Sequence, residues 1–193
     1  MSLSVLWEDP ELIFVLKPAG VSAQSPGLPE QIAEYTGGEA YVLHRLDRDV
    51  SGVIVYAKTK AAAAAVSAQI AAGELTKEYL ALVSGHPAPA GELRDLLYHD
   101  RGRNKTYVVK RPRRGVKEAI LTYTTEETRP DSTLVRVHLV TGRTHQIRVQ
   151  FASRGYPLIG DAKYGGPKGK IALRSRLVSL SHPTTGERIT VEV

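Results

Sequence analysis

The feature of this sequence that most restricts its fold is an alternation of apolar and polar residues with a period of two. It is clearest in AILTYTT (119–125) and TLVRVHLV (133–140), and this period is typical of strands with one buried face. Other strand-like segments are short runs bounded by turn residues. They are LIFVLKPAGV (12–21), GVIVYAKT (52–59), KEYLALVSG (77–85) and the closing SRLVSLSHPTTGERITVEV, which predicts two strands around the turn HPTTGE.

One helix is predicted over KAAAAAVSAQIAA (60–72). Thr59 can cap its first turn, and Gly73 is a typical residue to end it. Val66 and Ile70 are four residues apart, so they form a modest stripe that can be buried.

A second helix is predicted within TGRTHQIRVQFASRG (141–155). Ile147 and Phe151 lie four residues apart, and Gly155 is a good helix stop. Strands dominate and no repeat or linker separates them. We therefore predict an α+β fold, with residues 1–193 forming a single domain around a mostly antiparallel mixed sheet with a few flanking helices.

The composition excludes several chemistries. The chain has no cysteine, which excludes disulfides, thiolate catalysis and cysteine-ligated zinc and suits a cytoplasmic protein. The six histidines follow no metal-ligand spacing, and GGPKGK (165–170) lacks the pattern of a phosphate loop. No apolar run approaches the roughly 20 residues that span a bilayer, and the start lacks the features of a signal peptide. We predict no metal, no cofactor and no membrane association.

Positive charge is concentrated in RGRNKTYVVKRPRRGVK (101–117). This segment holds eight basic residues and no acidic one, so the rest of a chain with net charge +6 is net negative. Such a concentration indicates a surface that faces a polyanion, with Arg111, Arg113 and Arg114 as candidate contacts. A solvated basic loop is the alternative.

The loop HRLDRDVSG (44–52) carries a cluster of charge immediately before a strand-like run. Asp47 lies between Arg45 and Arg48, which can keep its carboxylate ionised. A carboxylate of this kind can act as the nucleophile in breaking a glycosidic bond. Asp49 lies two residues further on, and the spacing does not decide which aspartate is chemical. A structural ion pair is the alternative for Asp47.

HRLDRDVSG resembles the central motif of the RluA-type RNA pseudouridine synthases, in which HRLDxxxSG surrounds an essential aspartate. LKPAGV (16–21) resembles the first motif of that family, and KEYLALVSG resembles the strand that carries its active-site tyrosine. TGRTHQIRVQFASRGYPLIGDAKYGG (141–166) resembles the third motif and the segment after it, and SLSHPTTGE resembles the C-terminal strand and turn. The resemblance covers almost the whole chain and implies the pseudouridine synthase catalytic fold.

The resemblance also implies a reaction, the isomerisation of uridine to pseudouridine within RNA. The N1–C1′ bond breaks and uracil is rejoined through C5, which requires no metal, redox change or group donor. Many relatives carry a small S4 RNA-binding domain ahead of the catalytic domain. Because the first motif here begins near residue 12, we expect this sequence to lack one. We expect the partner to be ribosomal or transfer RNA, with messenger RNA less favoured, and no obligate protein partner.

Three side chains are implied to be catalytic. Asp47 matches the aspartate that attacks C1′ or otherwise drives the departure of uracil. Tyr79 matches the tyrosine that stacks on the target base and is a proposed proton acceptor, although the residues alone favour a core strand tyrosine. Arg148 matches the arginine that pairs with the aspartate, with a surface helix arginine as the alternative. Lys17 and Pro18 are expected to shape the pocket wall without taking part in the chemistry.

Four further residues are implied to bind the substrate. A target uridine stacked in folded RNA must be flipped into a pocket. Arg45 is expected to fill the space that the base leaves, because a planar guanidinium can both stack and hydrogen bond. His44 beside it is expected to contact the substrate, and Arg143 and His145 are expected to bind phosphate or to brace their loop.

Two rival functions would require different residues. A non-catalytic RNA-binding or RNA-remodelling protein on the same fold would be expected to lack Asp47, Tyr79 or Arg148, and all three are present. A glycosidase would require a second positioned carboxylate, for which the motifs offer only Asp49.

Overall fold

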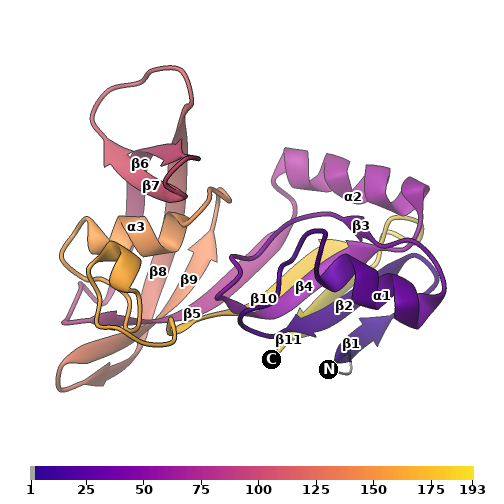
Figure 1. The fold of residues 1–193 in the computed structure, drawn as a ribbon, viewed down its shortest axis with the longest axis horizontal. Helices are drawn as coiled ribbons and strands as arrows, with labels where there is room; N and C mark the ends of the chain where they lie inside the picture. The colour runs from indigo at the N-terminus through magenta and orange to yellow at the C-terminus, as the bar shows by residue number, and fades with distance from the viewer. Residues whose placement is uncertain (1–2) are drawn as a thin grey trace. The chain divides into compact units, whose positions relative to one another are not determined.

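A computed structural model describes residues 3–193, which fall into two compact units. Unit 1 comprises the described part of Met1–Lys77 together with Arg174–Val193, and unit 2 comprises Glu78–Leu173 (Figure 1). Each unit combines paired strands with helices. That residues 1–193 form one domain stays a prediction.

The sheet of unit 1 uses strands from both ends of the described chain. They are β1 (Val5–Glu8), β2 (Leu12–Lys17), β3 (Tyr41–Val42), β4 (Ser51–Ala57), β10 (Leu173–Ser181) and β11 (Arg188–Glu192). Their order is β1-β2-β4-β10, with β11 paired to β10 and β3 paired to β4. The pairing of β4 with β10 is parallel, and the other pairings described in this unit are antiparallel. The strands predicted within residues 12–21 and 52–59 and the two predicted in the closing segment are confirmed, whereas β1 and β3 were not predicted.

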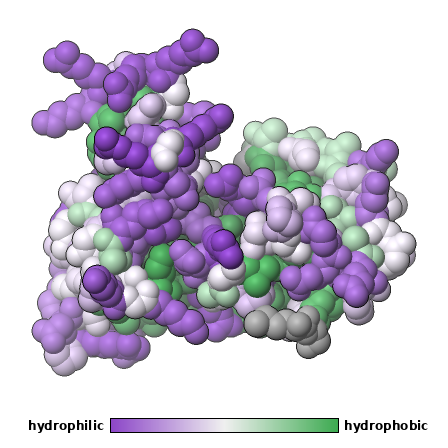
Figure 2. Space-filling view, viewed as in Figure 1, coloured by the Kyte–Doolittle hydropathy of each residue, from purple (hydrophilic) through white to green (hydrophobic). Residues whose placement is uncertain are grey.

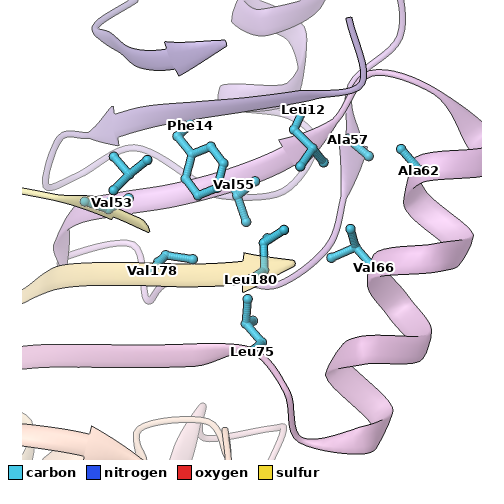
Figure 3. Close-up of a cluster of buried hydrophobic side chains, with 11 residues drawn as sticks. Leu12, Phe14, Val53, Val55, Ala57, Ala62, Val66, Leu75, Val178 and Leu180 are labelled. Carbon is cyan, nitrogen blue, oxygen red and sulfur yellow. The ribbon is translucent and has the colours of Figure 1, made fainter. Parts of the chain in front are cut away.

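The core of unit 1 lies between its sheet and helix α2 (Lys60–Ala72). Every second residue of β2 and β4 contributes to it, because the register pairs Phe14 with Val55 and Leu12 with Ala57. Figure 3 shows these side chains pointing toward one another from the two strands, β10 and the helix. The buried members are Leu12, Phe14, Val53, Val55, Ala57, Ala62, Val66, Leu75, Val178, Leu180 and Val191.

The helix predicted at residues 60–72 has the expected caps. The side chain of Thr59 accepts a hydrogen bond from the first turn, and Gly73 ends the helix in the left-handed conformation. Val66 is buried in the core and Ile70 packs against it. The sequence analysis missed a second helix in this unit, α1 (Leu28–Thr36), which is short and ends at a left-handed glycine.

The strands of unit 2 follow one another in long antiparallel ladders. They are β5 (Thr76–Ser84), β6 (Ala90–Asp100), β7 (Lys105–Val109), β8 (Val116–Arg129) and β9 (Ser132–Leu139). Their order is β5-β9-β8-β6-β7. The strands predicted at 77–85, 119–125 and 133–140 are confirmed, and β8 is twice as long as predicted. Together with the parallel contact in unit 1, these ladders confirm the α+β class and the mostly antiparallel mixed sheet.

The helix predicted within residues 141–155 is shorter than expected. Helix α3 covers Gln146–Ala152, because His145 before it adopts the left-handed conformation with φ of 55°. The helix is buried on all sides from Gln146 to Phe151. The side-chain amide nitrogens of its two glutamines donate to carbonyl oxygens of the sheet, and Phe151 packs edge-on against Tyr123. A 3-10 turn, η1 (Ala162–Tyr164), follows.

Candidate functional site

Asp47 lies in a loop that is anchored on both sides by apolar residues. Leu46 and Val50 are buried in unit 1, and the N–H of Val50 donates to the carbonyl oxygen of Asp47 at 3.0 Å. Asp47 itself is partly buried, whereas Arg45 and Asp49 are exposed. The backbone that carries the candidate nucleophile is therefore fixed, while its charged neighbours face solvent.

Lys17 joins this loop to the turn that follows β2. Its side chain is fully buried, and Nζ donates to the carbonyl oxygens of Pro18, Val21 and Arg48 at 3.0, 2.8 and 2.9 Å. The N–H of Gly20 also donates to the carbonyl of Arg48, and the Arg48 Nε donates back to the carbonyl of Gly20, each at 2.8 Å. All three ammonium protons have acceptors. These hydrogen bonds join the LKPAGV and HRLDRDVSG motifs to each other.

The charge of Lys17 interacts with both aspartates of the loop. Burial lowers the pKa of Lys17 to about 8, and the negative charges of Asp49 and Asp47 oppose this lowering. At pH 7 the ammonium is still protonated and donates all its hydrogen bonds. The expectation that Lys17 stays out of the chemistry is untested, but its position is that of a brace for the Asp47 loop.

The last residue of the HRLDRDVSG motif, Gly52, lies where a side chain would not fit. Its φ is +124°, and it pairs with Ser175 where β4 meets β10. A Cβ at Gly52 would lie 2.1 Å from the carbonyl oxygen of Ser175, so a side chain there would push the two strands apart. The Ser175 hydroxyl donates to the carbonyl of Val53 at 2.9 Å and closes the same junction.

His44, at the start of the loop, is a neutral imidazole that accepts a hydrogen bond. Its Nε2 accepts the backbone N–H of Val55 in β4 at 3.3 Å. Burial, with a smaller effect from the charge of Lys77, lowers the pKa of His44 to about 3, so the ring is neutral at pH 7. A neutral imidazole attracts phosphate poorly, and the observed bond fixes the start of the loop. Contact between His44 and the substrate stays a prediction.

Tyr79 lies on β5 opposite Val137 of β9. Its side chain is 6% exposed, and it shares its face of the strand with the buried Ala81 and Val83. This is the position expected of a core strand tyrosine, and it also leaves part of the residue accessible. Its stacking on a target base stays a prediction.

Arg148 is held by a bidentate ion pair within unit 2. Its Nε donates to Oδ2 of Asp161 at 2.6 Å and its Nη2 donates to Oδ1 at 2.9 Å, with the two side chains 4% and 1% exposed. The guanidinium carbon lies 5.2 Å from the centre of the Tyr164 ring. The alternative of a surface helix arginine is wrong, because the short α3 is buried on all sides. The predicted pairing of Arg148 with Asp47 stays a prediction.

Tyr164 extends this cluster to the start of β7. Its hydroxyl accepts the N–H of Thr106 and contacts Nδ1 of His145, each at 2.8 Å. The Thr106 hydroxyl donates to the carbonyl of Thr144 at 2.8 Å, so it accepts the bond from Nδ1 of His99 at 3.0 Å. Burial raises the pKa of Tyr164, which keeps its hydroxyl protonated. His145 therefore braces its loop, one of the two roles expected for it.

The remaining predicted contacts also lie in unit 2. Arg143 is partly buried, and its Nε donates to the carbonyl oxygen of Glu118 at 2.9 Å. Arg111, Arg113 and Arg114 are exposed in the turn between β7 and β8. Figure 2 shows hydrophilic side chains projecting from this end of unit 2. The basic segment is not a plain loop, because its middle residues form β7.

The structure therefore arranges the predicted residues in two groups. In unit 1, His44, Arg45 and Asp47 share one loop. In unit 2, Arg148 and His145 are joined by a cluster that the sequence analysis did not identify, Asp161 and Tyr164. Both residues lie in GDAKYGG. The acidic and aromatic residues between glycines in this segment could have identified them as candidates from the sequence.

Across residues 3–193, no group of three or more histidine, aspartate or glutamate side chains is placed to hold a metal ion. Over the same residues, no helix has the length and apolar character needed to cross a membrane.

Comparisons with known proteins agree on one family. The model of the family "RNA pseudouridylate synthase" matches residues 11–153. The dual-specificity RNA pseudouridine synthase RluA of Escherichia coli (strain K12) is 33% identical over 97% of this chain and 91% of its own length. The ribosomal large subunit pseudouridine synthase D of Zymomonas mobilis is 29% identical over 97% of this chain and 67% of its own. The solved structure of human RNA pseudouridylate synthase domain containing 1 superposes with a TM-score of 0.84 and 25% identity, covering 99% of this chain and 82% of that chain.

Proposed function

Because this chain belongs to the RNA pseudouridylate synthase family and is an RNA pseudouridine synthase, we propose that it acts on structured ribosomal or transfer RNA with Asp47 as its nucleophile. The observation that carries the proposal is the family match over residues 11–153, which contains Asp47, Tyr79 and Arg148. The hydrogen bond from the buried Lys17 to the carbonyl oxygen of Arg48, the residue after Asp47, supports it, because a nucleophile must be held in place to act.

The reaction is an isomerisation, so every non-hydrogen atom of uridine is retained. The Asp47 carboxylate engages C1′ as the N1–C1′ bond breaks and the ribose carbon becomes electron-poor. Uracil then turns, and C5 bonds to C1′ as the bond between C1′ and the Asp47 carboxylate breaks and frees the carboxylate. C5 loses its proton and N1 gains one from solvent, so no oxidant, donor or cofactor is consumed.

The other side chains have roles toward the same uridine. We assign Tyr79 to stacking on the target base and to accepting the C5 proton, and Arg148 to stabilising the Asp47 carboxylate. The bidentate grip of Asp161 supports the second assignment, because it fixes the guanidinium in one orientation. Arg148 has further N–H donors beyond the two that bind Asp161.

Access to the base requires that it leave the RNA stack. We assign Arg45, which is exposed beside Asp47, to the space that the flipped base leaves. His44, Arg143 and His145 position the loops around the substrate, and Arg111, Arg113 and Arg114 bind RNA phosphates. We further propose that the protein acts alone in the cytoplasm, which the absence of cysteine supports.

The test is pseudouridine formation by the purified protein on transcripts made in vitro. Transfer RNA and fragments of ribosomal RNA are incubated with protein dialysed against a chelator, and pseudouridine is mapped at each position. We expect a small number of uridines in one RNA class to be converted without an added metal or second protein. Tight RNA binding without conversion in any transcript would favour the non-catalytic RNA-binding alternative.

A further inference from the structure

We propose that the face of unit 2 that carries Tyr98 and Tyr107 is a stacking surface for unpaired nucleobases of RNA. The inference deepens the proposed function, since it rests on RNA being the ligand. It concerns how that RNA is held, and not the chemistry at Asp47.

The two tyrosines face the same side of a three-stranded end of the sheet. Tyr98 of β6 lies directly opposite Tyr107 of β7 in an antiparallel pair, and on its other side Tyr98 lies opposite Val116 of β8. Residues directly opposite each other project from the same face of a sheet, with Cβ atoms roughly 5 Å apart. Both tyrosines are only partly buried.

The other face of the same strands is already occupied. Leu97, one residue before Tyr98, is buried with Ala119 and with Val149 of α3. Thr106, one residue before Tyr107, is buried under the hydroxyl of Tyr164. The core of unit 2 therefore accounts for the side chains that point inward, and the two tyrosines lie on the opposite face of their strands.

Basic side chains surround the tyrosine pair. The Arg113 guanidinium carbon lies 4.7 Å from the centre of the Tyr98 ring, and Nζ of Lys105 lies 5.8 Å from the centre of the Tyr107 ring. Arg103 reaches the Tyr107 hydroxyl, and this hydrogen bond raises the pKa of the guanidinium. Asp100 lies 3.9 Å from Arg103 and pairs weakly with it. Arg113, Lys105 and Arg103 thus lie beside the two rings, and Nζ of Lys105 also lies 5.4 Å from the centre of the Tyr164 ring.

The combination of aromatic rings and cations favours unpaired RNA over double-stranded RNA. Phosphates alone would require cations and no aromatic rings, whereas a ring and an adjacent guanidinium offer planes on which bases stack. The bases of a duplex are stacked on one another and their faces are not available. Unpaired nucleotides in a loop or a bulge satisfy both the rings and the cations.

The experiment measures binding and requires no turnover. The probes are a labelled oligouridylate of about ten nucleotides, an RNA duplex of similar length, and an abasic ribose-phosphate oligomer of the same charge. Tyr98→Val and Tyr107→Val remove the rings and keep residues suited to strands, and Tyr98→Phe and Tyr107→Phe are the matched controls.

We expect each valine variant to bind oligouridylate about tenfold more weakly, each phenylalanine variant to bind within about twofold of the parent, and duplex binding to be unchanged. The parent should also prefer oligouridylate to the abasic oligomer by about tenfold or more, which tests the inference even if the valine variants fold poorly.

Equal binding of oligouridylate by all four variants, or no preference for it over the abasic oligomer, would overturn the inference and leave the isomerase activity intact. A parent protein that forms no pseudouridine, while the two valine variants still lose oligouridylate binding, would instead overturn the proposed function and leave the stacking surface standing.

Discussion

At the scale of single residues, each unit uses a buried charged side chain to hold one candidate catalytic group in place. The loop of Asp47 is braced by the Lys17 ammonium, which binds three backbone carbonyls, and Arg148 is gripped by both oxygens of Asp161. Buried charges are costly unless they are fully paired. Both braces should therefore appear in stability as well as in activity.

Because Lys17 is buried, the free energy of unfolding should increase as the pH rises above about 8. The pKa of Lys17 falls from 10.5 to about 8 on folding, so between these values the unfolded chain holds a proton that the folded chain has lost. The free energy of unfolding then increases with pH over this window, by about 3 kcal/mol at most. Denaturant unfolding at about pH 7 and about pH 10 measures this change in the parent and in Lys17→Met.

The Lys17→Met variant should lack this rise, and it should be less stable than the parent at pH 7 because three carbonyls lose their donor. The exposed Lys60→Met variant should keep the parent's pH dependence. An identical pH dependence in the parent and Lys17→Met would contradict the account.

Asp161→Asn should destabilise the protein by about 3 kcal/mol, because it leaves the buried Arg148 charge without its anion. Glu127→Gln is the matched control, since it breaks the exposed pair with Arg129 and should cost less than about 1 kcal/mol. Urea unfolding of the two variants gives the comparison. Similar losses of stability in both variants would mean that the buried Arg148–Asp161 pair stabilises the fold no more than an exposed pair does.

At the scale of secondary-structure elements, function depends on where strands meet and where they turn. The Asp47 loop runs directly into β4, which pairs with β10 only where Gly52 lets the two backbones approach. The basic segment folds back as β7 and then turns into β8. Each junction predicts a specific sensitivity to substitution.

Gly52→Ala should prevent the close approach of β4 and β10. Its Cβ would meet the Ser175 carbonyl at 2.1 Å and its φ is positive, so we expect a loss of about 3 kcal/mol or more. Gly73→Ala is the control, because Gly73 is also left-handed but a methyl group added there would have nothing within 4 Å, and it should cost only about 1–2 kcal/mol. Thermal unfolding compares them, and equal losses would show that the strand junction is not the cause.

Changing Arg111, Arg113 and Arg114 together to alanine should weaken RNA binding at low salt. If all three contact phosphate, the slope of log K against log salt should flatten by up to about two to three units. The rate at saturating RNA should barely change, because Asp47 is untouched. Arg129→Ala, which removes an exposed arginine from the same unit, serves as the control. An unchanged affinity and slope would mean that the basic segment is a solvated loop.

At the scale of the whole molecule, the sequence predicted most of the strands, the capped helix at residues 60–72 and the fold class, because period-two patterns and caps are local signals. It missed α1, β1, β3, β6 and β7, whose patterns are short or interrupted by charged residues. It also missed the burial of Arg148, because Asp161 is thirteen residues away and only the tertiary fold brings the two together. The candidate residues themselves came from motifs, since single charged residues carry no such information.

The central claim is that Asp47 performs the chemistry, and release of the C5 hydrogen measures it most directly. RNA transcribed with uridine tritiated at C5 loses its label when C5 becomes bonded to C1′. If Asp47 is the nucleophile, the parent and Asp49→Asn should both release the label. Asp47→Asn should release none, although it should bind RNA within a few-fold of the parent. Measurable turnover by Asp47→Asn would contradict the claim.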